Sequence, residues 1–209
     1  MKSTTKPSAQ TILIALSSFS VASLLISNLA ATKLFNLGGI PMDGGIILFP
    51  LVFILSDLIA ELFGKKPAKA TIFTAFALNL LAAIVFFIVQ VLPPAIGWDN
   101  QSAYEVTLGL FPRILAASLI SYLISSLLDL KVFIHLKKPK ITFLRRSIIS
   151  TLVGNLANSL VFCTIAFLGI VSVSELFQMI GLSLAIIVPL SIVLAPVAAI
   201  IVRKLKNYV

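Results

Sequence analysis

Residues 48–66 read LFPLVFILSDLIAELFGKK, and this stretch decides the fold. It is an apolar run of nearly the ~20 residues that an α-helix needs to cross a hydrocarbon core about 30 Å thick. Its acids, Asp57 and Glu61, are four residues apart and therefore share one helical face. An ionised side chain at mid-bilayer costs on the order of 2.5–3.5 kcal/mol, so these acids are expected to line an interior cavity or to pair with another group.

Five further apolar runs of membrane-spanning length accompany this one. Of the 209 residues, 59% are hydrophobic and 11% are charged, whereas soluble domains have about 45–50% and 25%. The fold class expected is an all-α membrane protein, a single domain over residues 1–209 with six transmembrane helices. The expected spans are residues 11–35, 46–64, 70–92, 111–136, 147–169 and 177–202.

The basic residues are unevenly distributed between the connecting segments. Fourteen of the sixteen Lys and Arg residues fall before the first span, between the second and third, around the fourth-to-fifth connection, or after the sixth. Only Lys33 and Arg113 fall on the other side. The positive-inside rule then predicts that both termini are cytoplasmic, so the net charge of +9 reflects topology and not a nucleic-acid partner.

Several classes of site are disfavoured by what the chain contains. One cysteine, Cys163, and one histidine, His135, cannot form an intrachain disulfide or a Cys/His zinc cluster. No phosphate-binding P-loop motif is present. Ser183 lies in a setting that resembles an intramembrane serine protease, but His135 is about 20 Å away in depth. We therefore expect no catalytic residue, no metal and no cofactor.

Polar residues fall at matching depths in different spans. Asp57 and Asp129 each lie eight residues before a lysine pair, which puts both about 12 Å from the same membrane face. The same helical rise places Asn79, Asn155 and Asn158 about 14–18 Å from basic residues at that face. The sequence therefore predicts a polar layer across the inner half of the bundle.

The polar residues also share helical faces. Ser118, Tyr122, Ser125 and Asp129 form one stripe about 60° wide, and residues 151, 155 and 158 form another. The alternatives differ by residue. Asn79 and the serines of the first span are expected to join helices, whereas Glu61 could reach the head groups and Arg113 could be an interfacial anchor.

Several separated motifs resemble the queuosine precursor transporter family, also called the vitamin uptake transporter family. They cover residues 25–165 in the family's order. The motifs are SNLAATK (27–33), DGG (43–45) leading to LFPL (48–51), SDLIAELFGKK (56–66), RILAAS (113–118), LDLKVF (128–133) and STLVGNLANS (150–159).

This resemblance implies import of 7-deazaguanine bases across the bacterial inner membrane for tRNA modification. The bases implied are 7-cyano- and 7-aminomethyl-7-deazaguanine and, in some members, queuine. It also implies similarity to the six-helix substrate-binding components of energy-coupling-factor vitamin transporters. One departure is Asn158, where many relatives carry an aspartate, and this leaves the choice among the bases open.

A guanine-like base suits these residues chemically. A carboxylate can accept its ring N–H and exocyclic amino group together, an amide can donate to its carbonyl, and aromatic rings can stack on it. Loss of uptake is therefore expected for Asp57→Asn or Asp129→Asn. The predicted binding residues are Asn28, Asp57, Glu61, Arg113, Tyr122, Asp129, Asn155 and Asn158.

The energy source remains open between two alternatives. The chain could be a self-sufficient carrier, with a proton moving on Glu61 or Asp129. It could instead be the binding subunit of an energy-coupling-factor transporter, and only then would it need ATPase and coupling partners. Other expected partners are membrane lipid, the nucleobase itself and a second copy of the chain.

Overall fold

The computed structural model describes residues 8–37, 40–108, 112–169 and 172–209. Within these residues six helical segments are long and apolar enough to cross a membrane, which confirms the predicted fold class. The long helices are α1 (Ala9–Ala30), α2 (Phe49–Phe63), α3 (Lys65–Val91), α5 (Pro112–His135), α6 (Phe143–Phe167) and α7 (Val173–Leu205). A short 3-10 helix, η1 (Gly44–Ile47), extends the second span.

The helix boundaries follow local capping chemistry. Ser8 and Thr142 each accept a backbone N–H at the start of α1 and α6, and Ser172 with Glu175 forms a capping box at the start of α7. Gly64 separates α2 from α3 with a φ of 88°, a backbone conformation that glycine adopts without steric cost.

The connection after the first span differs from the prediction. The span was expected to continue to residue 35, but α1 ends at Ala30. The apolar residues that follow belong to β1 (Leu34–Leu37), which pairs antiparallel with β2 (Ile40–Asp43). Hydropathy alone does not distinguish a short apolar strand from the continuation of a helix. The eight-residue helix α4 (Gln101–Leu108) was also not predicted.

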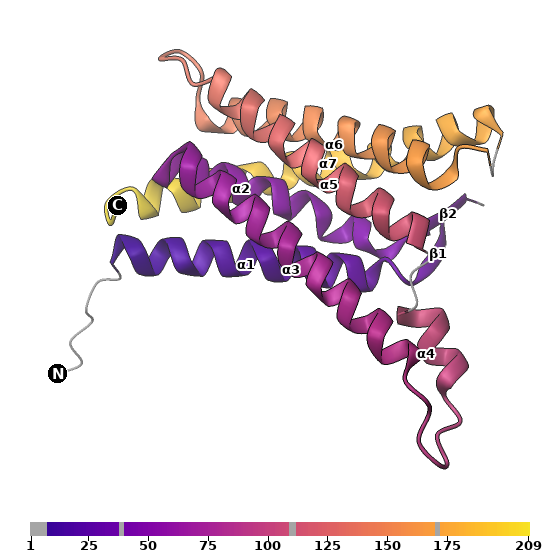
Figure 1. Ribbon diagram of the computed structural model, residues 1–209. Helices are drawn as coiled ribbons and strands as arrows, with labels where there is room; N and C mark the ends of the chain where they lie inside the picture. The colour runs from indigo at the N-terminus through magenta and orange to yellow at the C-terminus, as the bar shows by residue number, and fades with distance from the viewer. Residues whose placement is uncertain (1–7, 38–39, 109–111, 170–171) are drawn as a thin grey trace.

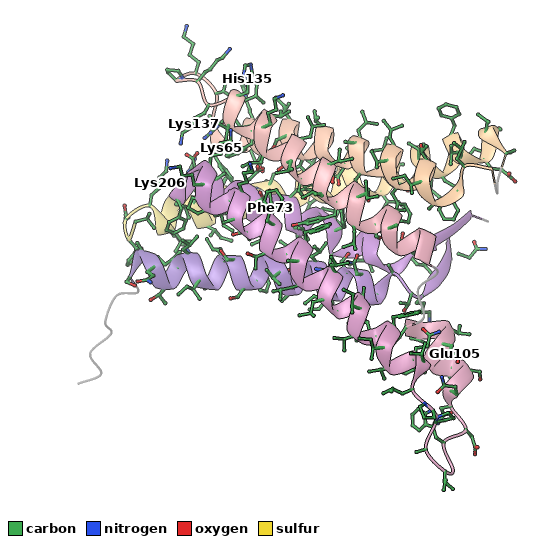
Figure 2. The ribbon with its side chains drawn as sticks, in the orientation of Figure 1. Lys65, Phe73, Glu105, His135, Lys137 and Lys206 are labelled. Atoms are coloured by element: carbon green, nitrogen blue, oxygen red, sulfur yellow. The ribbon has the colours of Figure 1, made fainter. Side chains whose placement is uncertain are left out.

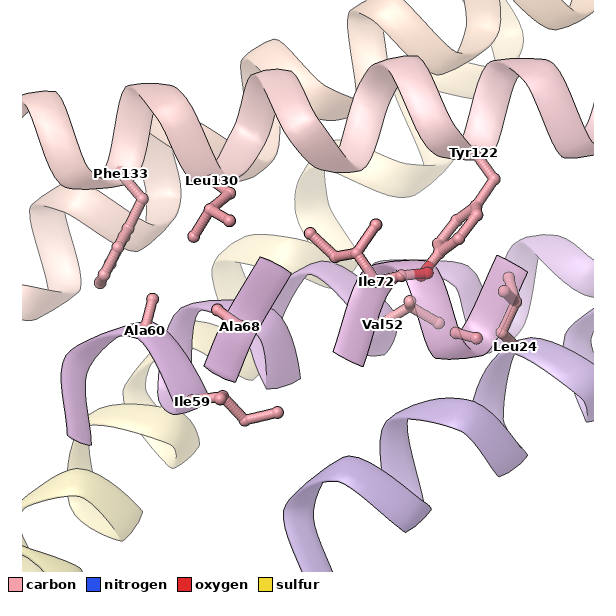
Figure 3. Packing of buried hydrophobic residues seen from close by; sticks show 10 residues of the cluster. Leu24, Val52, Ile59, Ala60, Ala68, Ile72, Tyr122, Leu130 and Phe133 are labelled. Carbon is pink, nitrogen blue, oxygen red and sulfur yellow. The ribbon is translucent and has the colours of Figure 1, made fainter. Parts of the chain in front are cut away.

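Helix α2 is the centre of the bundle. It packs against each of the other five long helices, and 61% of the residues in the most apolar 18-residue stretch of its span are buried, a larger share than in any other span described. Figure 1 shows α1, α3, α5, α6 and α7 arranged around it. In Figure 3, Leu130 and Phe133 of α5 extend toward Ala68 of α3 and Ala60 of α2. The outer faces keep large apolar side chains exposed, such as Phe87 and Val193, as a lipid-facing surface requires.

The two ends of the bundle differ in character. At one end lie Lys65, His135, Lys137 and Lys206, and we call it the basic end (Figure 2). The opposite end carries the β1–β2 hairpin and α4, and we call it the hairpin end (Figure 1). Helix α1 begins, and α7 ends, at the basic end.

Candidate functional site

A cavity of about 280 Å³ lies in the half of the bundle nearer the hairpin end. This volume is just below the ~300–1,000 Å³ typical of small-molecule sites. All six long helices contribute to its wall. Its polar lining includes Ser27, Asn28, Asp43, Asn79, Ser118, Ser121, Asn158 and Ser159, and its aromatic lining is Phe49, Phe86, Phe162 and Phe167.

Three amides lie in this wall: Asn28, Asn79 and Asn158. The Asn28 Nδ2 donates to Asn79 Oδ1 over 2.7 Å, and the Asn79 Nδ2 donates to the Ala75 carbonyl over 2.9 Å. The Oδ1 of Asn158 is buried and has no hydrogen-bonding partner in the described part of the chain. Because a buried acceptor without a donor costs about 1–3 kcal/mol, Asn158 favours a ligand that donates an N–H.

Asp43 adds a carboxylate to the same wall. Its Oδ1 accepts the N–H of Gly45 over 2.9 Å, which caps η1. Burial raises the pKa of the Asp43 carboxyl above its ordinary value, although the backbone N–H of Gly45 lowers it. A carboxylate can accept further N–H donors from a ligand. Asp43 belongs to the DGG motif of the sequence but was not among the predicted binding residues.

The glycine pair after Asp43 explains how this carboxylate reaches the cavity. A Cβ on Gly44 would lie 2.6 Å from the Ala30 carbonyl oxygen, and one on Gly45 would lie 2.6 Å from that of Ser27. Ser27 also donates its hydroxyl to the Gly45 carbonyl over 2.8 Å. Only glycine permits this approach of η1 to the last turn of α1, so the DGG motif was the available signal.

Asp57 and Asp129 lie close together, but in a different layer of the bundle. Both side chains are fully buried. The Ser150 hydroxyl donates to Asp57 Oδ2 over 3.2 Å and lies beside Asp129 without completing a hydrogen bond to it. Neither acid lines the cavity. Phe49 at the cavity and Asp57 are eight positions apart on α2, which is about 12 Å along the helix.

Glu61 lies one turn further toward the basic end and is fully engaged by cations. Its carboxylate contacts Arg146 at 2.8 Å, Lys206 at 3.2 Å and Lys137 at 3.6 Å. Its side chain is only 6% exposed, as is typical of a structural ion pair and not of a side chain that reaches into the head groups. Glu61 does not line the cavity.

The remaining predicted residues are distributed around the core. Tyr122 points from α5 toward α3, where its hydroxyl donates to the Ile72 carbonyl over 3.4 Å (Figure 3). Asn155 donates to the Ser191 hydroxyl over 3.3 Å. Neither lines the cavity. The side chain of Arg113 lies outside the described residues. Of the eight predicted residues, the structure therefore places Asn28 and Asn158 in the cavity wall.

Comparison with known proteins identifies one family model and several relatives that are named as transporters. The sequence profile of a family described as "Putative vitamin uptake transporter" matches residues 43–201. A probable queuosine precursor transporter of Bacillus subtilis is 28% identical over 69% of this chain and 64% of its own length. The queuosine precursor transporter of Escherichia coli is 28% identical over 73% of this chain and 67% of its own length.

A third relative, a probable queuosine precursor transporter of Haemophilus influenzae, is 29% identical over 59% of this chain and 51% of its own length. The match thus spans about two thirds or less of these curated relatives. No solved structure matches the chain significantly.

Proposed function

The chain belongs to the vitamin uptake transporter family, and from this membership we propose that it imports queuosine precursors across a bacterial inner membrane. The relatives are named as transporters and not as enzymes. The substrates proposed are 7-cyano- and 7-aminomethyl-7-deazaguanine. Both bases have the hydrogen-bonding edge of guanine.

The cavity in the hairpin half carries this proposal. A guanine-like edge offers a ring N–H, an exocyclic amino group and a carbonyl oxygen. The Asp43 carboxylate and the unpartnered Asn158 Oδ1 provide acceptors for the two donors, and an amide NH₂ provides a donor for the carbonyl. Phe49 and Phe162 in the wall offer apolar faces against which a planar ring can stack.

The proposed direction of transport is from the hairpin end to the basic end. The positive-inside rule puts the lysine-rich end in the cytoplasm, and the cavity then faces the outside of the membrane. The ion pairs around Glu61 close the opposite end. This arrangement supports a protein that is loaded from outside.

Cells unable to synthesise the precursor provide the test. Such cells are fed each base with and without this protein, and the queuosine content of their tRNA is measured. We expect queuosine to be restored only when protein and base are both present. Equal queuosine content without the protein contradicts the proposal. Uptake by the purified chain in liposomes further separates a self-sufficient carrier from a binding subunit, because only the former works without ATPase partners.

A further inference from the structure

Two carboxyl groups at the centre of the bundle have fewer hydrogen-bond donors than two carboxylates require. Asp57 and Asp129 are both 0% exposed. Asp57 accepts one hydroxyl, that of Ser150, while neither oxygen of Asp129 has a partner among the described residues. A buried, ionised carboxylate normally needs a cation or several donors.

No described cation forms a salt bridge with either acid of this pair, and Lys131, two residues after Asp129 on α5, is exposed. Arg146 of α6 acts electrostatically on Asp57, but its Nη2 bonds Glu61, its guanidinium stacks on the Phe133 ring at 4.7 Å, and its Nε and Nη1 form no hydrogen bond to either acid. Helix α1 carries no charged residue, and the Lys and Arg residues of α3 and α7 lie at the basic ends of those helices. Glu61, the other acid on α2, already has three cationic partners.

A shared proton removes this imbalance. Two buried carboxylates that interact electrostatically are costly to keep ionised together in a medium of low dielectric constant, so one of them retains a proton. No additional volume is needed for a proton, which suits a site whose side chains are fully buried. Glu61 is unsuited to the same role because its three cations favour the ionised form.

We propose that the Asp57–Asp129 pair is the proton-binding site that couples proton movement to transport. This inference rests on the proposed function. It separates two tasks that the sequence assigned to the same residues: the cavity in the hairpin half binds the base, and the acid pair binds the driving proton.

Unpartnered hydroxyls extend from the pair on both neighbouring helices. Ser147 and Thr151 of α6 and Ser126 of α5 are buried, and their oxygens lack partners among the described residues. Hydroxyls can both accept and donate, so they can relay a proton. In each cycle one O–H bond forms on a carboxylate as a proton enters from the hairpin side. That bond breaks as the proton leaves toward the basic end. Each hydroxyl of the relay gives up one proton as it receives another, so no other bond changes over the complete cycle.

The test uses the purified full chain in liposomes that contain a pH-sensitive dye. Labelled 7-aminomethyl- or 7-cyano-7-deazaguanine is supplied outside, with the vesicle interior alkaline by one pH unit. For one proton per base, we expect accumulation to rise about tenfold over vesicles without a gradient. Addition of base should acidify the interior, and a protonophore should abolish both effects.

Variants locate the coupling site. Asp129→Asn and Asp57→Asn should each lose the tenfold response to the pH gradient and the base-dependent acidification. Asp99→Asn, which changes an exposed acid in the α3–α4 connection, is the matched control and should keep both. Size-exclusion profiles show whether each variant folds, and the dye signal of the unmodified chain tests coupling independently of any variant.

The outcomes separate the inference from the proposed function. Exchange of labelled for unlabelled base by the unmodified chain, without a dye signal or with a response only to a sodium gradient, overturns proton coupling and leaves the transport function intact. A folded Asp129→Asn chain that still responds to the pH gradient overturns the assignment to this pair. Absence of any exchange by the unmodified chain rejects the proposed function, and the inference with it.

Discussion

Gly154 lies where α6 approaches both α5 and α2. A Cβ at this position would lie 2.9 Å from the Asp129 Cβ and 3.1 Å from Phe53 Cε1. Atoms this close cannot be accommodated without a shift, and both neighbours are themselves buried. The absence of a side chain at this residue is therefore what allows α6 to pack this closely against Asp129 of α5 and Phe53 of α2.

Gly154→Ala is expected to destabilise the protein by about 1–3 kcal/mol, the usual cost of overpacking a core. Thermal unfolding in detergent measures the change. The matched control is Gly181→Ala on α7, where an added Cβ meets nothing within 4 Å. Gly181→Ala should be neutral or slightly stabilising, because alanine favours helix more than glycine does. Equal melting temperatures for both variants would contradict the packing argument.

Asn158 offers a second test at the residue scale. Asn158→Leu keeps a side chain of similar length but removes the unpartnered acceptor from the cavity wall. Loss of one hydrogen bond of about 1.4 kcal/mol should weaken base binding about tenfold. Isothermal titration of the detergent-solubilised protein measures the affinity, with the exposed substitution Ser174→Leu as control. Unchanged affinity for Asn158→Leu would place the base elsewhere.

At the scale of elements, one carboxylate joins the ends of four segments. Glu61 of α2 contacts Arg146 of α6, Lys206 at the end of α7 and Lys137 just after α5. The Arg146 pair is almost fully buried, whereas the two lysine side chains are each 58% exposed. Breaking the buried pair should cost more stability than breaking an exposed pair, because solvent screens the exposed charges.

Glu61→Gln should therefore cost about 3–5 kcal/mol, because Arg146 is left as a buried cation without its partner. Lys137→Gln should cost under about 1 kcal/mol, because its pair is exposed. Thermal unfolding in detergent at low and high salt compares the two. If both variants lost equal stability, the buried pair would not hold this end of the bundle together.

At the scale of the whole molecule, the bundle has a cluster of ion pairs near one end and a cavity nearer the other. The Glu61 ion pairs lie at the basic end, and the cavity lies in the hairpin half. The acid pair lies between them. This order suits a carrier in which the base binds in one layer and ion pairs close the other end. To expose the cavity to the basic end, the Glu61 ion pairs would have to separate.

Single-cysteine variants test this asymmetry in intact cells. In a Cys163→Ser background, Ser183→Cys places a thiol in the cavity wall, and Lys66→Cys places one at the basic end. A membrane-impermeant maleimide should label residue 183 from outside, and added base should slow that labelling. Residue 66 should be labelled only after permeabilisation. If only residue 66 were labelled from outside, the proposed orientation would be wrong.

The sequence predicted the features that depend on distance along the chain. Apolar run lengths defined the six spans, and the shared eight-residue spacing put Asp57 and Asp129 at one depth. The location of the cavity depends on how helices tilt and pack, which spacing does not encode. Asp43 was missed because an acid outside a span is usually solvated. Arg146 is one of the basic residues around the fourth-to-fifth connection that the positive-inside rule puts at the cytoplasmic face, but its side chain is buried against Phe133 and Glu61.

The contact of Gly44 and Gly45 with the backbone of α1 has a mechanical consequence. Carbonyl oxygens of the last turn of α1 contact these glycines with no side chain between them. The connection between α1 and η1 therefore leaves little room for relative movement. If α1 tilts, the β1–β2 hairpin and Asp43 must therefore move together with it as one rigid body. Opening of the cavity at the hairpin end would thus be a rigid-body movement of α1 with the hairpin and not a local movement of one loop.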